Sequence, residues 1–232
     1  KLKEDWFEGS TYVLTALIVH TVIKIWVAGE AARRFVEDRR SGALELMLST
    51  PITVKEIVRG QQRGLIRQFL GPGLCILGVD FLMMLAEISP PTTESEIEWM
   101  LVWFAGMAIF VFDLIALAWI SMWLGLKSQK VNRAAGGAVA RIMFLPWGLF
   151  AGSFMLLAIL SIFFKSGIFF RHLSEGSPIV YWFILSAANN AFWITYARSR
   201  FLQNFRELAT QRFDASKSFW GFLKNPPVIP GR

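Results

Sequence analysis

The sequence predicts an all-α membrane protein, a polytopic bundle of transmembrane helices. Hydrophobic residues make up 54% of the 232 residues and charged residues only 18%, whereas a soluble domain carries about 25% charged residues. The apolar residues also gather in windows of about 20 residues, the length of helix that crosses a hydrocarbon core. Lysine and arginine collect between alternate windows, which is typical of loops on one side of a membrane.

Five windows are long enough to span a bilayer, at residues 12–32, 68–86, 99–126, 142–164 and 178–197. The first is the weakest, because His20, Lys24 and Glu30 lie within it. The second and third each hold one ionisable group, Asp80 and Asp113, and the last two hold none. We therefore expect five spans in the visible chain.

The cations predict the orientation of these spans. Lysine and arginine are concentrated in segments 33–67, 127–141 and 198–232, whereas the segment 88–98 has no cation and three glutamates. Because basic loops resist translocation, the three basic segments are expected on the cytoplasmic side. The cations of these cytoplasmic segments account for the net charge of +7, and nucleic-acid binding is not expected.

This orientation places residues 1–11 on the far side of the membrane. They lack the positive region, apolar run and small-residue cleavage site of a secretory signal. We therefore expect an upstream span that is missing from this sequence, so that the complete domain has six. At the other end, 198–232 is expected to form a cytoplasmic amphipathic helix along the inner leaflet, with Phe201, Phe205 and Leu208 on one face, followed by an extended tail.

Between the first two spans lies a short segment, residues 37–61, which we call the corner segment. Thr53 and Glu56 have the spacing of a capping box, which starts a helix. Pro51 lies just upstream and ends any helix that arrives from the N-terminal side. The segment thus predicts a short helix over about 42–49 and a second helix that runs from Thr53 into the second span.

The short helix is predicted to have an apolar face formed by Leu44, Met47 and Leu48. A fixed corner with an apolar face is typical of a docking element for another protein. An amphipathic helix that rests on anionic lipid is the alternative, and the arginines of the segment favour it.

The corner segment also carries a recognisable sequence motif. Its residues are Arg39, Arg40, Gly42, Ala43, Leu44, Glu45, Leu46, Leu48, Thr50, Pro51, Glu56, Ile57, Gly60 and Gln61. With this motif the segment resembles the type-2 ATP-binding-cassette (ABC-2) transporter permeases. Ala43 stands where threonine is commoner in that family, and Gln61 where lysine is commoner. The specific motif covers about 25 residues, and the remaining resemblance is one of hydropathy and topology.

The resemblance implies that the corner segment contains the coupling helix, which inserts into a groove of an ATPase subunit. It also implies a second permease half, identical or related, and a multi-pass protein of a prokaryotic plasma (inner) membrane that acts in export. The residues expected to bind the ATPase are Arg39, Arg40, Gly42, Leu44, Glu45, Met47, Leu48, Thr50, Pro51 and Glu56.

The chain lacks the phosphate-binding loop Gly-x-x-x-x-Gly-Lys-Ser/Thr. ATP and Mg²⁺ are therefore expected in the partner subunit, with no cofactor on this chain and no enzymatic activity of its own. Motifs for zinc, thiol or serine hydrolase chemistry are also absent from the sequence. Cys75 is expected to pack as a small hydrophobic residue.

Polar residues within the spans are candidates for a substrate path, because each is costly in hydrocarbon. Asp80 is 13 residues beyond Arg67 and Asp113 is 14 before Lys127, which gives the two carboxylates similar depths and allows a shared cavity. A proton site, a substrate contact or helix packing would each account for them. For Asn189 and Asn190 we favour helix packing.

Two further function classes stay open on the sequence alone. The chain would be a self-sufficient ion-coupled carrier or channel if Asp80 and Asp113 bound the ion, or a membrane scaffold that transports nothing. Helix breakers, Gly71-Pro72-Gly73 and Pro146, predict kinks in the second and fourth spans. The substrate is not encoded in any motif.

Overall fold

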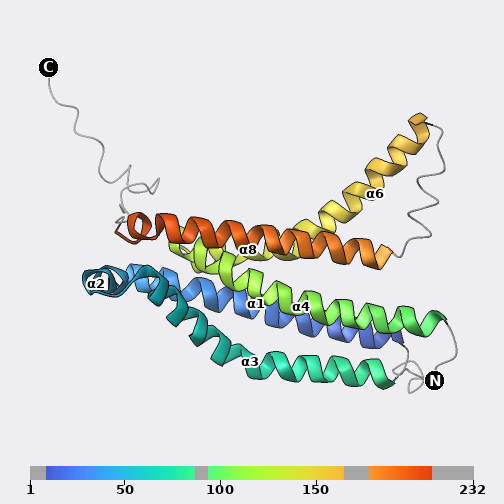
Figure 1. The fold of residues 1–232 in the computed structure, drawn as a ribbon, viewed down its shortest axis with the longest axis horizontal. Coiled ribbons are helices and arrows are strands. Elements are labelled where there is room, and N and C mark those ends of the chain that lie inside the picture. The colour runs from blue at the N-terminus through green and yellow to red at the C-terminus, as the bar shows by residue number, and fades with distance from the viewer. Residues whose placement is uncertain (1–8, 87–93, 165–177, 211–232) are drawn as a thin grey trace, which may run out of the picture.

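The protein is a bundle of long helices (Figure 1). The computed structural model describes residues 9–86, 94–164 and 178–210, and every regular element within these ranges is a helix. The prediction of an all-α fold is confirmed. The elements are α1 (Gly9–Arg40), α2 (Ala43–Ser49), α3 (Val54–Ala86), α4 (Glu94–Lys127), α5 (Val131–Val139), the π-helical segment η2 (Ala140–Phe144), α6 (Leu145–Phe164) and α8 (Pro178–Thr210).

Four helical stretches among the described residues are long and apolar enough to cross a membrane, namely Thr11–Arg40, Val54–Ala86, Trp99–Lys127 and Val131–Leu160. They contain the first three predicted windows and most of the fourth. The fifth window lies in α8, which is long enough but is not among the four. Its adjacent asparagines, Asn189 and Asn190, lower the hydropathy of an otherwise apolar stretch, and the fifth span stays a prediction.

The half of the bundle nearest α2 is densely packed. Helices α1, α4 and α8 run in the same direction there, and α3 runs opposite to them (Figure 1). Ala28, Ala31 and Ala32 on α1 are fully buried. Gly125 on α4 lies so close to α1 that a Cβ atom at this position would sit 2.6 Å from the carbonyl oxygen of Ala32. Small side chains therefore allow the two helices to approach closely.

Helix α8 corrects one prediction. The segment from residue 198 was expected to lie along the inner leaflet, and it is the continuation of α8, which runs unbroken to Thr210. Phe201 and Phe205 are fully buried, and the Phe201 ring packs edge to face on Phe35 with centroids 5.1 Å apart. The apolar face was correctly predicted, but it covers the bundle core instead of lipid.

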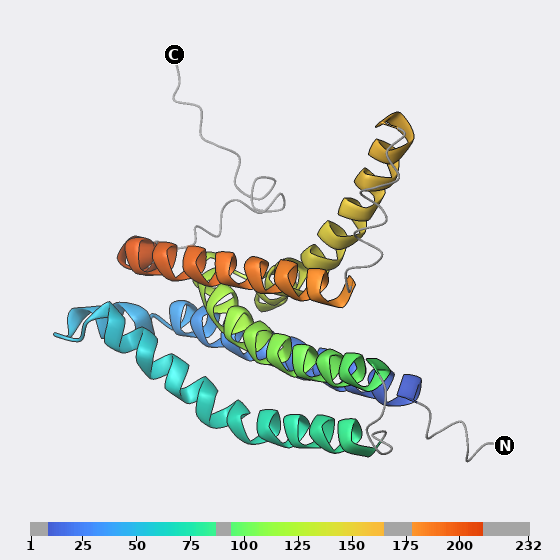
Figure 2. The same ribbon diagram turned by 45° about the vertical axis from the view of Figure 1, so that its right-hand side comes forward.

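Both predicted kink sites coincide with irregular helices. Pro72 lies within α3, which bends along its length (Figure 1 and Figure 2). Pro146 follows η2, whose wider turn accommodates a proline ring that crowds the carbonyl of the preceding turn. Helix α6 leans away from α8 in both views.

Several predictions concern residues outside the described ranges. These are the first eight residues, most of the acidic segment 88–98 and the tail 211–232. Cys75 lies within the described residues, and it is exposed. It lies on the outward face of α3, so it does not pack against the core of the bundle.

The contact between Gly125 and Ala32 predicts a local sensitivity to added volume. We expect Gly125→Ala to lower the thermal unfolding midpoint of the detergent-solubilised protein, with a cost of about 1–3 kcal/mol typical of overpacking. The matched control is Gly106→Ala on the same helix, where an added Cβ meets nothing within 4 Å. The control should keep or raise the midpoint, because alanine stabilises a helix relative to glycine. Equal midpoints for both variants would contradict the packing described here.

Candidate functional site

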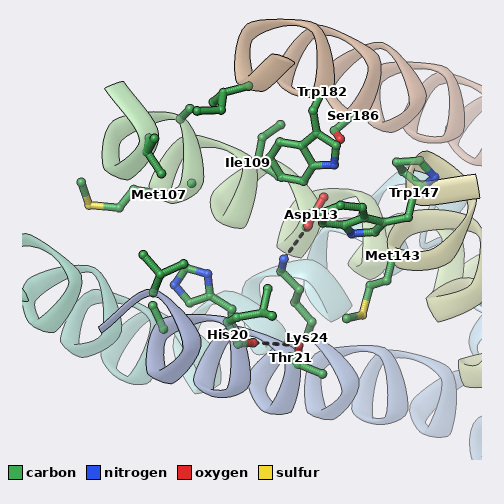
Figure 3. A pocket seen from close by; sticks show the side chains of 18 of the residues that line it. His20, Thr21, Lys24, Met107, Ile109, Asp113, Met143, Trp147, Trp182 and Ser186 are labelled. Atoms are coloured by element: carbon green, nitrogen blue, oxygen red, sulfur yellow. Dashed lines mark hydrogen bonds and ion pairs between the residues drawn. The ribbon is translucent and has the colours of Figure 1, made fainter. Parts of the chain in front are cut away.

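The half of the bundle away from α2 contains a cavity of about 590 Å³. Its walls come from α1, α3, α4, η2, α6 and α8, and Figure 3 shows it from close by. Asp80 on α3 and Asp113 on α4 both line it. The two carboxylates that were predicted at similar depth therefore share one cavity.

Asp113 is held by a buried ion pair and a hydrogen bond. The ammonium Nζ of Lys24 lies 2.6 Å from Asp113 Oδ2, and the two side chains are 13% and 7% exposed. Asn190 Nδ2 donates to the other carboxylate oxygen, Oδ1, over 2.5 Å. Both oxygens of Asp113 thus have a partner, and α1, α4 and α8 meet at this carboxylate.

A second pair lies one helical turn earlier on α1. His20 Nε2 is 2.7 Å from Asp80 Oδ2. The imidazole also stacks on the Phe110 ring, with centroids 4.2 Å apart and an interplanar angle of 21°. Because positions 20 and 24 are four apart, both basic side chains project from the same face of α1. Two basic and two acidic side chains thus face one another in the cavity and are paired one to one.

The asparagines of α8 have different roles. Asn190 supports Asp113, whereas Asn189 Nδ2 donates to the carbonyl oxygen of Arg141 over 3.1 Å and so ties α8 to η2. Neither is among the residues that line the cavity. The preference for helix packing agrees with both hydrogen bonds, and only Asp80 and Asp113 of the predicted path residues face the cavity.

Sequence reasoning missed His20 and Lys24 as site residues. They were noted only as charges that weaken the first span. Their i, i+4 spacing within an apolar window was the available signal, because it puts two titratable groups on one helical face that must find partners inside the bundle.

The corner segment has the predicted local structure. Thr53 N donates to Glu56 Oε2 over 2.8 Å, and Glu56 N donates to Thr53 Oγ1 over 3.4 Å, which together form the capping box at the start of α3. Gly42 has a φ of 75°, a left-handed conformation that glycine adopts without steric cost. Thr50 Oγ1 donates to the carbonyl oxygen of Met47 at the end of α2.

The arginines of the corner segment are bound to the bundle. Arg39 Nη1 donates to the carbonyl oxygen of Leu126 over 2.5 Å, and Arg40 Nη2 donates to that of Gln129 over 2.7 Å. Cations at the C-terminal end of a helix, here α4, are favourable because the last carbonyls carry partial negative charge. Arg39 therefore braces α1 against the end of α4, and Arg40 braces it against the loop that follows α4, roles that were not predicted for them.

The same region is joined to α3 by side-chain hydrogen bonds. Gln61 Nε2 donates to Asp38 Oδ2 over 3.0 Å, and Arg34 Nη2 donates to Gln68 Oε1 over 2.8 Å. These two bonds join the end of α1 to the first half of α3, on either side of α2.

The predicted apolar docking face on α2 needs correction. Leu44 is fully buried, and Met47 and Leu48 are half-buried and pack on the bundle core. Periodicity identified a real apolar face, but the face covers the core and does not point to solvent. The large apolar side chains that are exposed at this corner are Leu46, 70% exposed, and Ile52, 46% exposed. Glu45, Thr50, Pro51 and Glu56 are exposed as well.

The fold and the site define a helical membrane protein with a charged intramembrane cavity and a braced corner at one end. Comparison with protein-family models gave no match. The searches of curated proteins and of solved structures gave no match either.

The buried pair predicts strong coupling between Lys24 and Asp113. We expect Lys24→Met or Asp113→Asn alone to cost about 3–5 kcal/mol, because each leaves one buried charge without its partner. The double variant should regain most of this loss, because no unpaired charge remains. Thermal unfolding of all four proteins in detergent gives the coupling free energy.

Arg33→Met is the control for this cycle. Arg33 pairs with Glu30 and Glu37 on the exposed face of α1, and its side chain is 50% exposed, so its loss should leave the unfolding midpoint nearly unchanged. Additive losses in the Lys24 and Asp113 double variant would contradict the buried pair.

Proposed function

We propose that this chain is the membrane-spanning permease subunit of an ATP-binding-cassette exporter, coupled to a separate ATPase subunit through its corner segment. The observation that carries the proposal is the exposure of Leu46 on α2 and of Ile52 just after it. Hydrogen bonds from the end of α1 to α3, to the end of α4 and to the loop after α4 hold the surrounding corner in place. The motif of the corner segment supports it, because its residues resemble the coupling region of ABC-2 permeases. A large apolar side chain left exposed on a rigid corner is suited to a pocket on a partner.

In this proposal, force on α2 reaches the cavity through α1. Arg39 connects the end of α1 to the end of α4, Arg40 connects it to the loop after α4, and Gln61 connects α3 to Asp38. Lys24 lies 15 residues before Arg39, or about 22 Å along a straight helix. A shift of α1 therefore moves His20 and Lys24 relative to Asp80 and Asp113, and changes the shape of the cavity between them.

The remaining components lie outside this chain. The partner ATPase holds ATP and Mg²⁺ and supplies the energy, since the chain has no phosphate-binding loop. A second permease half, identical or related, completes the substrate path. The assembly resides in a prokaryotic inner membrane.

The test uses the exposed leucine of α2. Leu46→Asp places a charge on a side chain that is 70% exposed, so folding should be unaffected while docking into an apolar pocket is lost. The protein is purified with its ATPase in a mild detergent, and ATP hydrolysis is measured after reconstitution in vesicles. We expect loss of the copurifying chain that carries the phosphate-binding loop, and a fall of at least tenfold in hydrolysis, the size of a lost hot-spot contact.

Gln203→Asp is the matched control. It adds the same charge at an exposed position of α8 in the same half of the bundle, and it should keep both the partner and the activity. Purification of the unaltered protein without any nucleotide-binding chain would argue against the proposal, as would equal effects of the two variants.

A second candidate is a self-sufficient ion-coupled carrier. The two buried pairs, His20–Asp80 and Lys24–Asp113, favour it, because titratable groups within a membrane often relay protons. Here an imposed pH gradient would drive transport in vesicles that contain this chain alone, and Asp80→Asn would remove the coupling. Transport that requires ATP and does not respond to the gradient excludes this candidate.

A further inference from the structure

Three of the described residues that line the cavity carry buried hydrogen-bond donors without a partner. The indole nitrogens of Trp103 and Trp182 and the hydroxyl of Ser186 belong to residues that line it, and within the described part of the chain these atoms are buried without a hydrogen-bond partner. Trp103 and Ser186 are only 5% and 2% exposed. Because buried donors are nearly always paired in folded proteins, three on one cavity indicate a ligand that accepts hydrogen bonds.

The strongest acceptors of the cavity are already engaged. Both oxygens of Asp113 bind Lys24 and Asn190, and Asp80 binds His20. The Lys24 ammonium has three N–H donors, of which one points to Asp113. The groups that remain to bind a ligand are therefore mainly hydrogen-bond donors. Such donors bind carbonyl, ester or hydroxyl oxygens.

The charges of the cavity disfavour an anionic ligand. The formal charges of two carboxylates, Asp80 and Asp113, at least balance those of the two basic side chains that pair with them, Lys24 and His20. A phosphate or carboxylate head would therefore approach a region of neutral or negative net charge. An uncharged polar group uses the same donors without that repulsion.

The rest of the wall is apolar and elongated. Figure 3 shows Met107, Met143 and Trp147 around the space between the ion pair and Trp182. The lining of α1 runs from Val13 to Lys24, which is about 16 Å of helix. Methionine and aromatic side chains adapt to flexible hydrocarbon, and the volume of about 590 Å³ is within the range of small-molecule sites.

We propose that the cavity binds an uncharged amphiphile. Its head presents ester, carbonyl or hydroxyl oxygens to Trp103, Trp182 and Ser186, and its apolar chain lies along Met107 and Met143. The site is assigned from the cavity alone and does not depend on the energy source. The identification of this amphiphile as the transported substrate rests on the proposed function.

The experiment uses a photoreactive diacylglycerol with a diazirine in one acyl chain. The full-length protein is reconstituted in phosphatidylcholine vesicles without ATPase or ATP, labelled, and digested for mass spectrometry. We expect labelling of the peptides that carry Met107 and Met143 to exceed labelling at Leu82, a side chain on α3 that is 65% exposed. Unlabelled dioctanoylglycerol should compete, whereas dioctanoyl phosphatidic acid and hexadecane should not.

Two conservative substitutions test the donors. Trp182→Phe and Ser186→Ala each remove one donor and keep most of the side-chain volume, and together they should lower the competable labelling by about tenfold or more, the effect of one or two lost hydrogen bonds. The controls make the same exchanges elsewhere. Trp26→Phe acts on a side chain that is 54% exposed, and Ser153→Ala acts on a hydroxyl bonded to the Phe150 carbonyl. Both should leave the labelling unchanged.

The proposal is overturned if the cavity peptides are labelled no more than Leu82. It is also overturned if the anionic lipid or the hydrocarbon competes as well as the glyceride, or if the donor variants behave like their controls. None of these readouts involves ATP, so a protein that binds the amphiphile but fails the ATPase test keeps this site and loses only the proposed exporter role.

Discussion

The arrangement of the helices depends on a single constraint, that a charge inside a hydrocarbon layer must meet an opposite charge or a hydrogen-bond donor. Lys24 lies midway along α1 and is satisfied by Asp113 of α4, which also accepts a hydrogen bond from Asn190 of α8. Rotation of any one of these helices would leave a charge unpaired. The His20–Asp80 pair adds α3 to the same arrangement. The contacts of one carboxylate and its neighbours thus fix the rotation and the relative height of four helices.

The ion pairs also lie at the boundary between two unlike halves of the bundle. Toward α2, alanines and Gly125 bring α1 and α4 into close contact, and Phe201 and Phe205 fill the space beside Phe35. Away from α2, the helices diverge and line the cavity. A packed half and an open half therefore meet at the charged groups, and packed interfaces tend to switch between discrete arrangements instead of deforming gradually.

Elements set by local chemistry could be predicted from the sequence, and contacts set by helix rotation could not. The Thr53–Glu56 capping box and the end of α2 near Pro51 depend on neighbouring residues, and both were predicted correctly. The partners of Lys24 and His20 lie 89 and 60 residues away, so their identity depends on how whole helices face one another. For the same reason Leu44 could be assigned to an apolar face, but the direction of that face could not be assigned.

The proposed function requires the corner segment to lie on the cytoplasmic side of the membrane, and it requires the cavity, which lies in the other half of the bundle, to open toward the opposite side. The most direct test replaces Cys75 with serine, introduces either Leu46→Cys or Met107→Cys, and exposes oriented vesicles to a membrane-impermeant thiol reagent on each side in turn. The account predicts that Leu46→Cys reacts only from the cytoplasmic side and Met107→Cys only from the opposite side. Reaction of both from one side, or no reaction of Leu46→Cys from either side, would contradict it.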